Sequence, residues 1–132
     1  MSKVIHTAGK RKTAIARATL KPGKGSIRVN SVMLEKFGTR LSRMKIQEPS
    51  ILAGDVAKTI SVDVKVIGGG PTAQADAARL AIARALVKFD KKLEKIFLNY
   101  DRNLLVADVR RKETRKPNRH GKARSKRQKS YR

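Results

Sequence analysis

The 132-residue sequence contains no cysteine, only five aromatic side chains and few acidic residues. The lack of cysteine excludes disulfides, thiolate metal sites and cysteine nucleophiles. No apolar run approaches the roughly 20 residues that a membrane-spanning helix needs. The N-terminal segment MSKVIHTAGK has no apolar signal core, so we expect the protein to stay in the compartment where it is made. His6 and His120 lie far apart without ligand-spaced neighbours, and we therefore expect no metal and no cofactor.

Catalytic constellations are also lacking. The aspartates are scattered rather than paired, most have a Lys or Arg within three residues, and the serines have no nearby histidine or other base. These aspartates are typical of charge partners and helix caps; they are Asp55, Asp63, Asp76, Asp90 and Asp101. We therefore predict that the protein is not an enzyme.

Positive charge is abundant. Lys and Arg number 33 against 10 Asp and Glu, which gives a formal net charge of +23. A small body with this excess repels itself unless a polyanion is bound, and nucleic acid is the commonest polyanion in a cell. An anionic membrane is the alternative, but the basic regions lack the Trp/Phe/Leu face of an interfacial helix. The charge therefore favours a nucleic-acid partner and no membrane.

The charge divides the chain into two parts. Residues 110–132 hold twelve Lys and Arg and one acid, Glu113, which is a net charge of +11 in 23 residues. Their only apolar or aromatic side chains are Ala123 and Tyr131, so this segment alone cannot bury enough surface to fold. We therefore predict a globular body at residues 1–109 and a basic extended tail at residues 110–132.

The pattern of the body predicts an α+β fold. The segments 13–20 and 26–32 flank KPGKG and predict a β-hairpin. In residues 59–67 valine and isoleucine alternate with polar residues, which predicts a half-buried strand. Short helical turns are expected at 32–38 and 39–50, the second ended by Pro49. A brief buried strand is expected at 104–109.

Two longer helices are expected to cover one face of this sheet. The alanine-rich segment from Pro71 to Lys88 predicts a long helix. A second helix is expected at 91–101, with Leu93, Ile96, Phe97 and Tyr100 at helical spacing. The expected core face of the first helix consists of Ala75, Ala78, Ile82, Ala85, Leu86 and Phe89.

Gly68, Gly69 and Gly70 stand between the predicted strand and the long helix. No Gly-Lys-Ser/Thr follows, so they do not form a P-loop, and they do not match GxGxxG. We interpret them as a structural loop, a tight turn with positive φ. A second interpretation is that their amides meet an RNA phosphate at the helix N-terminus without any catalysis.

Basic residues also gather on the body, while exposed aromatic residues are absent from its predicted strands. Lys10, Arg11 and Lys12 precede the first predicted strand, and Arg17 and Arg28 lie on the predicted hairpin. Several phosphate contacts are expected from such a number of cations. Reading single-stranded bases needs aromatic residues for stacking. We therefore predict that the protein recognises RNA shape and backbone rather than base sequence.

Four segments occur together and in order: GKRKTAIARATLKPGKG, IRVNS, GGGPTAQADAARLAIARAL, and YDRNLLVADVRRKETRK with the ending KARSKRQKSYR. Together they resemble, over essentially the whole chain, the family of the ninth protein of the small ribosomal subunit (numbered sixteen in eukaryotes). The ending Gln-Lys-Ser-Tyr-Arg is similar to the archaeal and eukaryotic branch, and the absence of eukaryotic insertions favours an archaeal member.

The resemblance implies a fold and a set of partners. The fold would be a small, mostly antiparallel sheet covered on one face by helices, with a left-handed βαβ crossover and a long basic extended C-terminal tail. The protein would be a cytoplasmic structural constituent of the small subunit, bound to ribosomal RNA and to neighbouring proteins in its head. The tail would thread through RNA, and its tip would contact the peptidyl-site tRNA.

The residues that match these roles fall into two groups. The tip, for tRNA, comprises Lys129, Ser130, Tyr131 and Arg132. The positions for ribosomal RNA are Lys10, Arg11, Lys12, Arg17, Arg28, Arg110, Arg111, Lys112, Arg115, Lys116, Arg119, Lys122 and Arg124. A free nucleic-acid chaperone or histone-like protein stays the alternative, because it would share the charge and the tail but would bind DNA and RNA alike.

Overall fold

Alternating apolar and polar side chains build a five-stranded sheet. The computed structural model describes residues 4–119 and 121–124. Its strands are β1 (Ile5–Arg11), β2 (Ala14–Pro22), β3 (Ile27–Val29), β4 (Val32–Met33) and β5 (Ile60–Ile67). They lie in the order β1-β2-β5-β3-β4, and only the β3–β5 pair is parallel. The prediction of a mostly antiparallel sheet is therefore confirmed.

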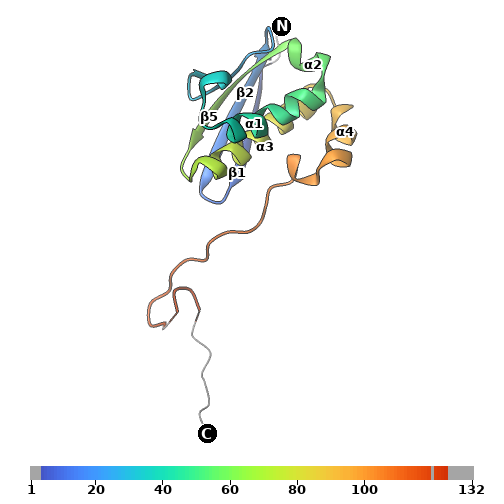
Figure 1. Cartoon of the computed structure of the whole chain (residues 1–132). Helices are drawn as coiled ribbons and strands as arrows, with labels where there is room; N and C mark the ends of the chain where they lie inside the picture. Colours follow the sequence, from blue (N-terminus) through green and yellow to red (C-terminus); the bar gives the residue numbers. More distant parts are fainter. Residues whose placement is uncertain (1–3, 120, 125–132) are drawn as a thin grey trace.

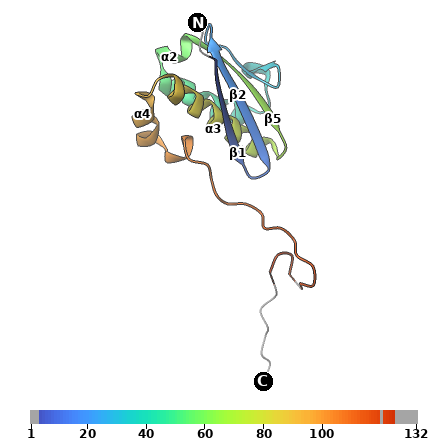
Figure 2. The ribbon, with the colours of Figure 1, turned by 180° about the vertical axis from the view of Figure 1, so that it is seen from behind.

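The helices cover one face of this sheet. They are α1 (Arg40–Ala53), α2 (Asp55–Lys58), α3 (Pro71–Phe89) and α4 (Leu93–Tyr100), with 3-10 turns at Leu34–Lys36 and Arg102–Leu104. Figure 1 shows α1 and α3 in front of the strands, and Figure 2 shows the opposite, uncovered face. The chain runs from β3 through α1 and α2 to its parallel neighbour β5, and in Figure 1 this βαβ crossover is left-handed.

The core lies between the sheet and α3. Every second residue of β2 and β5 is buried, as the alternation predicts. The predicted strand at 59–67 and the long helix are thereby confirmed, and Ile82 and Leu86 of α3 are fully buried. Phe89 was predicted in the core but is 44% exposed. It is the last residue of α3, and its ring lies past Leu86, the last buried position of the helix.

Small residues let α3 approach β1 very closely. A Cβ atom built on Gly9 would lie 2.3 Å from the carbonyl oxygen of Ala77 and 2.7 Å from the backbone nitrogen of Ala81. The Thr7 hydroxyl donates a hydrogen bond of 2.8 Å to the carbonyl of Ala81. The alanine-rich composition of α3 therefore fits a helix whose backbone lies almost against the edge strand.

Two predictions about the strands were wrong. The segments 13–20 and 26–32 do not form a hairpin with each other, because β5 lies between β2 and β3 and pairs with both. The partner of β2 in a hairpin is instead β1, which was not predicted as a strand. Lys10 and Arg11 therefore belong to the end of β1, and only Lys12 lies in the turn.

Two further expectations fail near the helices. Pro49 does not end a helix: α1 continues through it to Ala53. The loss of one hydrogen bond is offset because the Pro49 ring is fully buried. Residues 104–109 do not form a strand either; Leu104 is buried, but Val109 is 87% exposed.

The second of the two long helices that were predicted, α4, is shorter than expected and buries fewer side chains. Leu93 and Phe97 face the core, whereas Ile96 and Tyr100 are exposed. The Tyr100 hydroxyl reaches Glu48 of α1 and donates a hydrogen bond of 2.7 Å, which raises the pKa of Tyr100. Across residues 4–119 and 121–124, none of the helices has the length and apolarity to cross a membrane.

Candidate nucleic-acid interface

The uncovered face of the sheet is a shallow basic hollow. Its volume is about 1170 Å³, and β1, β2, β3 and β5 all contribute to its lining. Arg17, Arg28 and Lys65 project into it from three neighbouring strands, and the one acid in its lining is Asp63. Neither the strands nor the hollow contain Phe, Tyr or Trp, and the one ring in the lining is the imidazole of His6. The face therefore offers charge and hydrogen-bond donors but no row of Phe or Tyr rings for base stacking.

Two cations stand directly opposite each other on this face. Arg17 of β2 is the register partner of Lys65 of β5. Directly opposed side chains on neighbouring strands lie roughly 5 Å apart at Cβ, and like charges in such a pair repel. Within the described residues no ion pair or hydrogen bond involves either side chain. An anion above this pair would reduce the repulsion, and no acid among the described residues is the register partner of either side chain.

Asp63 balances the neighbouring row of the sheet. His6, Thr19, Asp63 and Arg28 follow one another across β1, β2, β5 and β3. The imidazole Nδ1 of His6 lies 3.1 Å from the Thr19 hydroxyl oxygen. Arg28 therefore faces a carboxylate across the sheet, whereas Arg17 and Lys65 do not.

Three of the predicted cations are committed to acids of the protein itself. Arg11 forms a short ion pair with Asp108 and lies 3.8 Å from Asp76. Arg110 also binds Asp108, with an Nη2 to Oδ2 distance of 2.7 Å. Arg124 binds Glu113 at 2.5 Å. Each of these arginines therefore has an acidic partner within the chain, which the pattern of charges did not predict.

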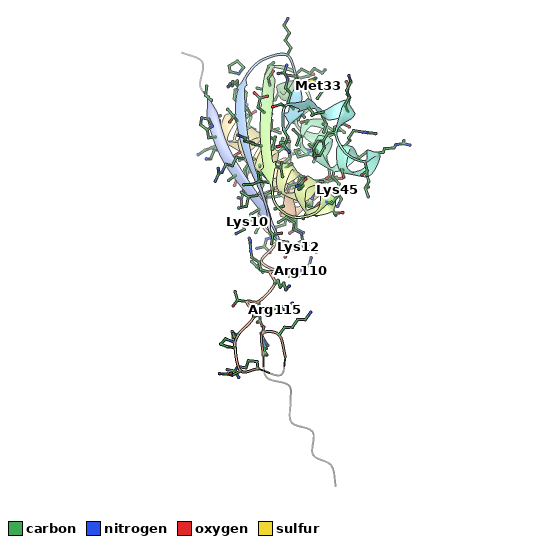
Figure 3. The ribbon with its side chains drawn as sticks, turned by 90° about the vertical axis from the view of Figure 1, so that its left-hand side faces the viewer. Lys10, Lys12, Met33, Lys45, Arg110 and Arg115 are labelled. Atoms are coloured by element: carbon green, nitrogen blue, oxygen red, sulfur yellow. The ribbon has the colours of Figure 1, made fainter. Side chains whose placement is uncertain are left out.

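The root of the tail is fixed by a cluster of contacts at the end of β1. Hydrogen bonds from the side chain and backbone of Arg110, and from the side chain of Arg11, hold the pKa of Asp108 well below its usual range. Arg111 donates to the carbonyl of Lys12 at 3.1 Å, and Arg84 donates to the carbonyl of Leu105 at 3.1 Å. Figure 3 shows Lys10, Lys12 and Arg110 together where the tail leaves the body. We call Arg11, Asp108 and Arg110 the tail-root cluster.

The described part of the tail extends away from the body as irregular backbone (Figure 1). It folds back once: the amide of Lys116 donates to the carbonyl of Lys122 at 3.2 Å, and Arg124 meets Glu113. Arg124 holds the pKa of Glu113 below its usual range. The predicted tail cations Lys112, Arg115, Lys116, Arg119 and Lys122 lie along this segment. The tip, Lys129 to Arg132, lies outside the described residues.

The three glycines form the turn between β5 and α3. Gly68 and Gly69 have φ values of 73° and 68°, in the left-handed region. A Cβ at Gly68 would lie 2.7 Å from the carbonyl oxygen of Thr13, whereas Gly70 has open space around it. The Gln74 side chain closes the turn by donating to the carbonyl of Gly68 at 3.0 Å. The loop therefore has a structural explanation at Gly68 and Gly69.

Lys65 and Lys88 were missed by the sequence analysis. Lys65 belongs to the alternation of β5, and that pattern predicts its outward position. The pattern does not predict that Arg17 is its partner on the neighbouring strand. Lys88 lies in the last turn of α3 and lines the hollow from the side of β1, where its ammonium lies 3.4 Å from the carbonyl oxygen of His6. Both placements depend on strand order, which local patterns do not contain.

The chain is similar to ribosomal proteins over nearly its whole length. The family model described as ribosomal protein S9/S16 matches residues 9–132. A protein of Methanococcus vannielii named small ribosomal subunit protein uS9 is 52% identical over 133 aligned residues, covering 98% of this chain and 99% of the relative. The protein of the same name from Methanococcus maripaludis strain C7 is 53% identical with the same coverage.

Proposed function

Because this chain belongs to the ribosomal protein S9/S16 family, as the match over residues 9–132 and relatives at 52–53% identity show, we propose that it is a structural constituent of an archaeal-type small ribosomal subunit. The relatives carry the name small ribosomal subunit protein uS9. Such a role is non-enzymatic and belongs in the cytoplasm with the ribosome.

The body binds small-subunit ribosomal RNA through the uncovered sheet face and the cations beside the tail root. The opposed pair of Arg17 and Lys65 carries this proposal, because it concentrates charge in a hollow whose one acid, Asp63, is level with Arg28 rather than with this pair. Backbone phosphates fit such a surface, since binding them releases counterions and requires no aromatic residue. Arg28, Lys10 and Lys12 extend the same contact region.

Residues 110–132 act as a separate tail that reaches other RNA. Twenty-three extended residues span at most roughly 80 Å, so a tail fixed at Asp108 can end in a different layer of the particle. Its tip, Lys129 to Arg132, contacts the peptidyl-site tRNA, as the family resemblance implies. The tail-root cluster supports this division, because it sets the point at which the tail leaves the body.

Reconstitution of small subunits tests the RNA-binding face. We expect a variant with Arg17, Arg28 and Lys65 changed to Gln to be displaced from subunits at lower salt than the wild type. A matched control changes three exposed cations near α4, namely Lys91, Lys92 and Lys95, to Gln and so removes the same charge. Sedimentation at increasing salt is the measurement. Equal displacement of the two variants would contradict a specific role of the sheet face, and equal binding of DNA and RNA would favour a nucleic-acid chaperone.

A deletion of residues 129–132 tests the tip. Subunits should assemble normally, because 31 of the 33 Lys and Arg residues remain. Dissociation of tRNA from the peptidyl site of programmed subunits should become modestly faster, since exposed phosphate contacts are individually weak. Arg132→Lys should lose less than Arg132→Ala. An assembly defect with unchanged tRNA dissociation would contradict the tRNA assignment.

A further inference from the structure

The basic tail contains one acid, Glu113, among twelve Lys and Arg residues. A negative charge in such a segment weakens its attraction for phosphate, so RNA affinity alone does not explain this residue. In the structure Glu113 accepts two hydrogen bonds from the guanidinium of Arg124, from Nε to Oε2 at 3.1 Å and from Nη2 to Oε1 at 2.5 Å. Bidentate pairs of this kind fix geometry as well as charge.

The backbone between these two residues turns back on itself. The amide of Lys116 donates to the carbonyl of Lys122 at 3.2 Å. Pro117 and Asn118 form a turn in which Asn118 has a φ of 57°. Pro followed by a residue that tolerates positive φ, such as Asn, is typical of tight turns. We call residues 113–119 and 121–124 the tail loop, and Figure 1 shows it as the bend in the described end of the tail.

Gly121 brings the two sides of the tail loop together. A Cβ atom built on Gly121 would lie 2.1 Å from the carbonyl oxygen of Arg124, and the tail loop could not keep its shape with any larger residue there. Three local features therefore agree with one another: the turn at Pro117 and Asn118, the glycine and the ion pair. Agreement between independent local features indicates that the sequence specifies this bend.

The tail loop shortens the tail. Glu113 and Arg124 are eleven residue steps apart, and an extended chain of that length spans roughly 36–40 Å. The ion pair instead holds their side chains in direct contact. Most of this length is therefore lost from the reach of the tail, and the residues that follow Arg124 begin closer to the body than an extended tail would place them.

The ion pair alone is too weak to close the tail loop. The side chains of Glu113 and Arg124 are 46% and 80% exposed, and exposed pairs contribute little and are screened by salt. Folding back also gathers four further cations, which repel one another. Bound phosphates reduce this repulsion, so RNA lowers the cost of closing the loop. The four cations are Arg115, Lys116, Arg119 and Lys122.

From these observations we infer that Glu113 is a positioning residue of the tail. When the protein is on RNA, Glu113 binds Arg124, closes the tail loop and sets how far the residues after Arg124 reach from the body. Arg124 thereby acts through Glu113, whereas the sequence assigned it to RNA. This inference rests on the proposed function, because RNA supplies the charge that closes the loop.

The absence of cysteine from the chain allows a direct measurement of the bend. Thr114→Cys and Ala123→Cys place two thiols on opposite sides of the tail loop without changing the charge. Spin labels on these thiols give their separation by pulsed electron paramagnetic resonance, in the free protein and in reconstituted small subunits. Where Ala123→Cys prevents entry into subunits, Lys122→Cys replaces it with the same outcomes.

Four variants are compared in this doubly labelled background. Glu113→Gln removes the ion pair, and Gly121→Ala disturbs the loop without changing any charge. The combination of Glu113→Arg with Arg124→Glu restores a pair of opposite sign order at the wild-type net charge. Glu94→Gln is the matched control, because it removes an exposed acid of α4 that has no ion pair among the described residues.

In subunits we expect a short separation for the wild type, for Glu94→Gln and for the swapped pair. Glu113→Gln and Gly121→Ala should lengthen it toward the roughly 30 Å of nine extended residue steps. A long separation in wild-type subunits, an unchanged one in Glu113→Gln, or no rescue by the swapped pair would each overturn the inference. The same short separation in the free protein would overturn its dependence on RNA. Failure of the wild type to enter subunits would instead contradict the proposed function.

Release of peptidyl-site tRNA measures the effect on reach. Subunits with Glu113→Gln should release tRNA faster, as those lacking residues 129–132 should, whereas Glu94→Gln and the swapped pair should match the wild type. A lengthened loop with normal release in Glu113→Gln, together with faster release in the deletion, would overturn the positioning role. Normal release in the deletion itself would contradict the tip assignment of the proposed function, and the label separations would still decide whether Glu113 closes the loop.

Discussion

Whether a cation forms an ion pair depends on which residues the fold places beside it. Arg11 and Arg17 belong to neighbouring strands, yet Arg11 is paired with Asp108, 97 residues away, and Arg17 faces Lys65. The sequence assigned both to RNA because local charge patterns do not distinguish a paired arginine from an unpaired one. The structure separates them, and only the unpaired Arg17 adds repulsion that a bound anion would relieve.

Gly9 is a residue of the body at which a single added methyl group should destabilise the packing of β1 on α3. Gly9→Ala forces a Cβ atom against the backbone of α3, because the oxygen of Ala77 lies 2.3 Å from its expected position. We expect β1 to shift from α3 and the free energy of unfolding to fall by about 1–3 kcal/mol, the usual cost of overpacking. Urea denaturation followed by circular dichroism measures this change.

Gly70→Ala is the matched control for this substitution. Gly70 has a φ of −96°, and no atom lies within 4 Å of the position of its Cβ. A weaker N-cap and a less flexible unfolded chain should offset each other to within about 0.5 kcal/mol. Equal destabilisation by the two variants would show that the close approach of β1 to α3 does not restrict position 9 to glycine.

Among whole elements, the predictable ones are those whose periodicity is complete within one segment. The strand from Ile60 to Val66 and the alanine-rich helix from Pro71 were both predicted, because the spacing of apolar residues within each segment indicates which face is buried. The pairing of β2 was not, because β5, nearly forty residues later, lies between the two expected hairpin strands. Pro49 misled for a related reason: its burial, which offsets its cost in a helix, depends on tertiary packing.

The tail-root cluster also depends on a distant contact and predicts a local effect. Asp108→Asn removes the carboxylate that binds Arg11 and Arg110. We expect residues 105–111 to loosen while the sheet and α3 stay folded. Faster hydrogen exchange at the amide of Arg110, which donates to Asp108 at 2.9 Å, is the measurement. Asp55→Asn removes a surface ion pair at 2.7 Å and should leave this exchange unchanged.

Acid should reproduce this loosening in the wild type. The pKa of Asp108 is lowered from its ordinary value of 3.8 by Arg110 and Arg11. A lowered pKa in the folded state means that the stabilisation is complete above the ordinary pKa and is lost as the pH falls through the lowered one. Exchange at Arg110, corrected for its intrinsic pH dependence, should therefore stay protected at pH 5 to 7. Loss of protection in that range would contradict the role of Asp108.

Considered as a whole, the molecule separates two kinds of surface. Unpaired cations occupy the uncovered sheet face, whereas exposed apolar side chains occupy the outer side of α1. Net charge alone predicts RNA binding but not this separation, since it sums over both surfaces. Of the two, the sheet face has the charge that fits a polyanion.

The salt dependence of RNA binding measures the charged side of this arrangement. Each phosphate neutralised releases counterions, so the slope of log K against log salt counts the contacts. For the wild type and small-subunit ribosomal RNA we expect a slope above about five in magnitude, from at least six contacts.

Changing Arg17, Arg28 and Lys65 to Gln should lower the magnitude of this slope by about two to three, because the neutral side chains no longer neutralise the phosphates that the cations would bind. The control with Lys91, Lys92 and Lys95 changed to Gln should keep the wild-type slope, although its net charge is the same. A flat slope for the wild type would indicate a hydrophobic or base-reading interface, and an equal fall in both variants would mean that net charge, rather than the sheet face, determines binding.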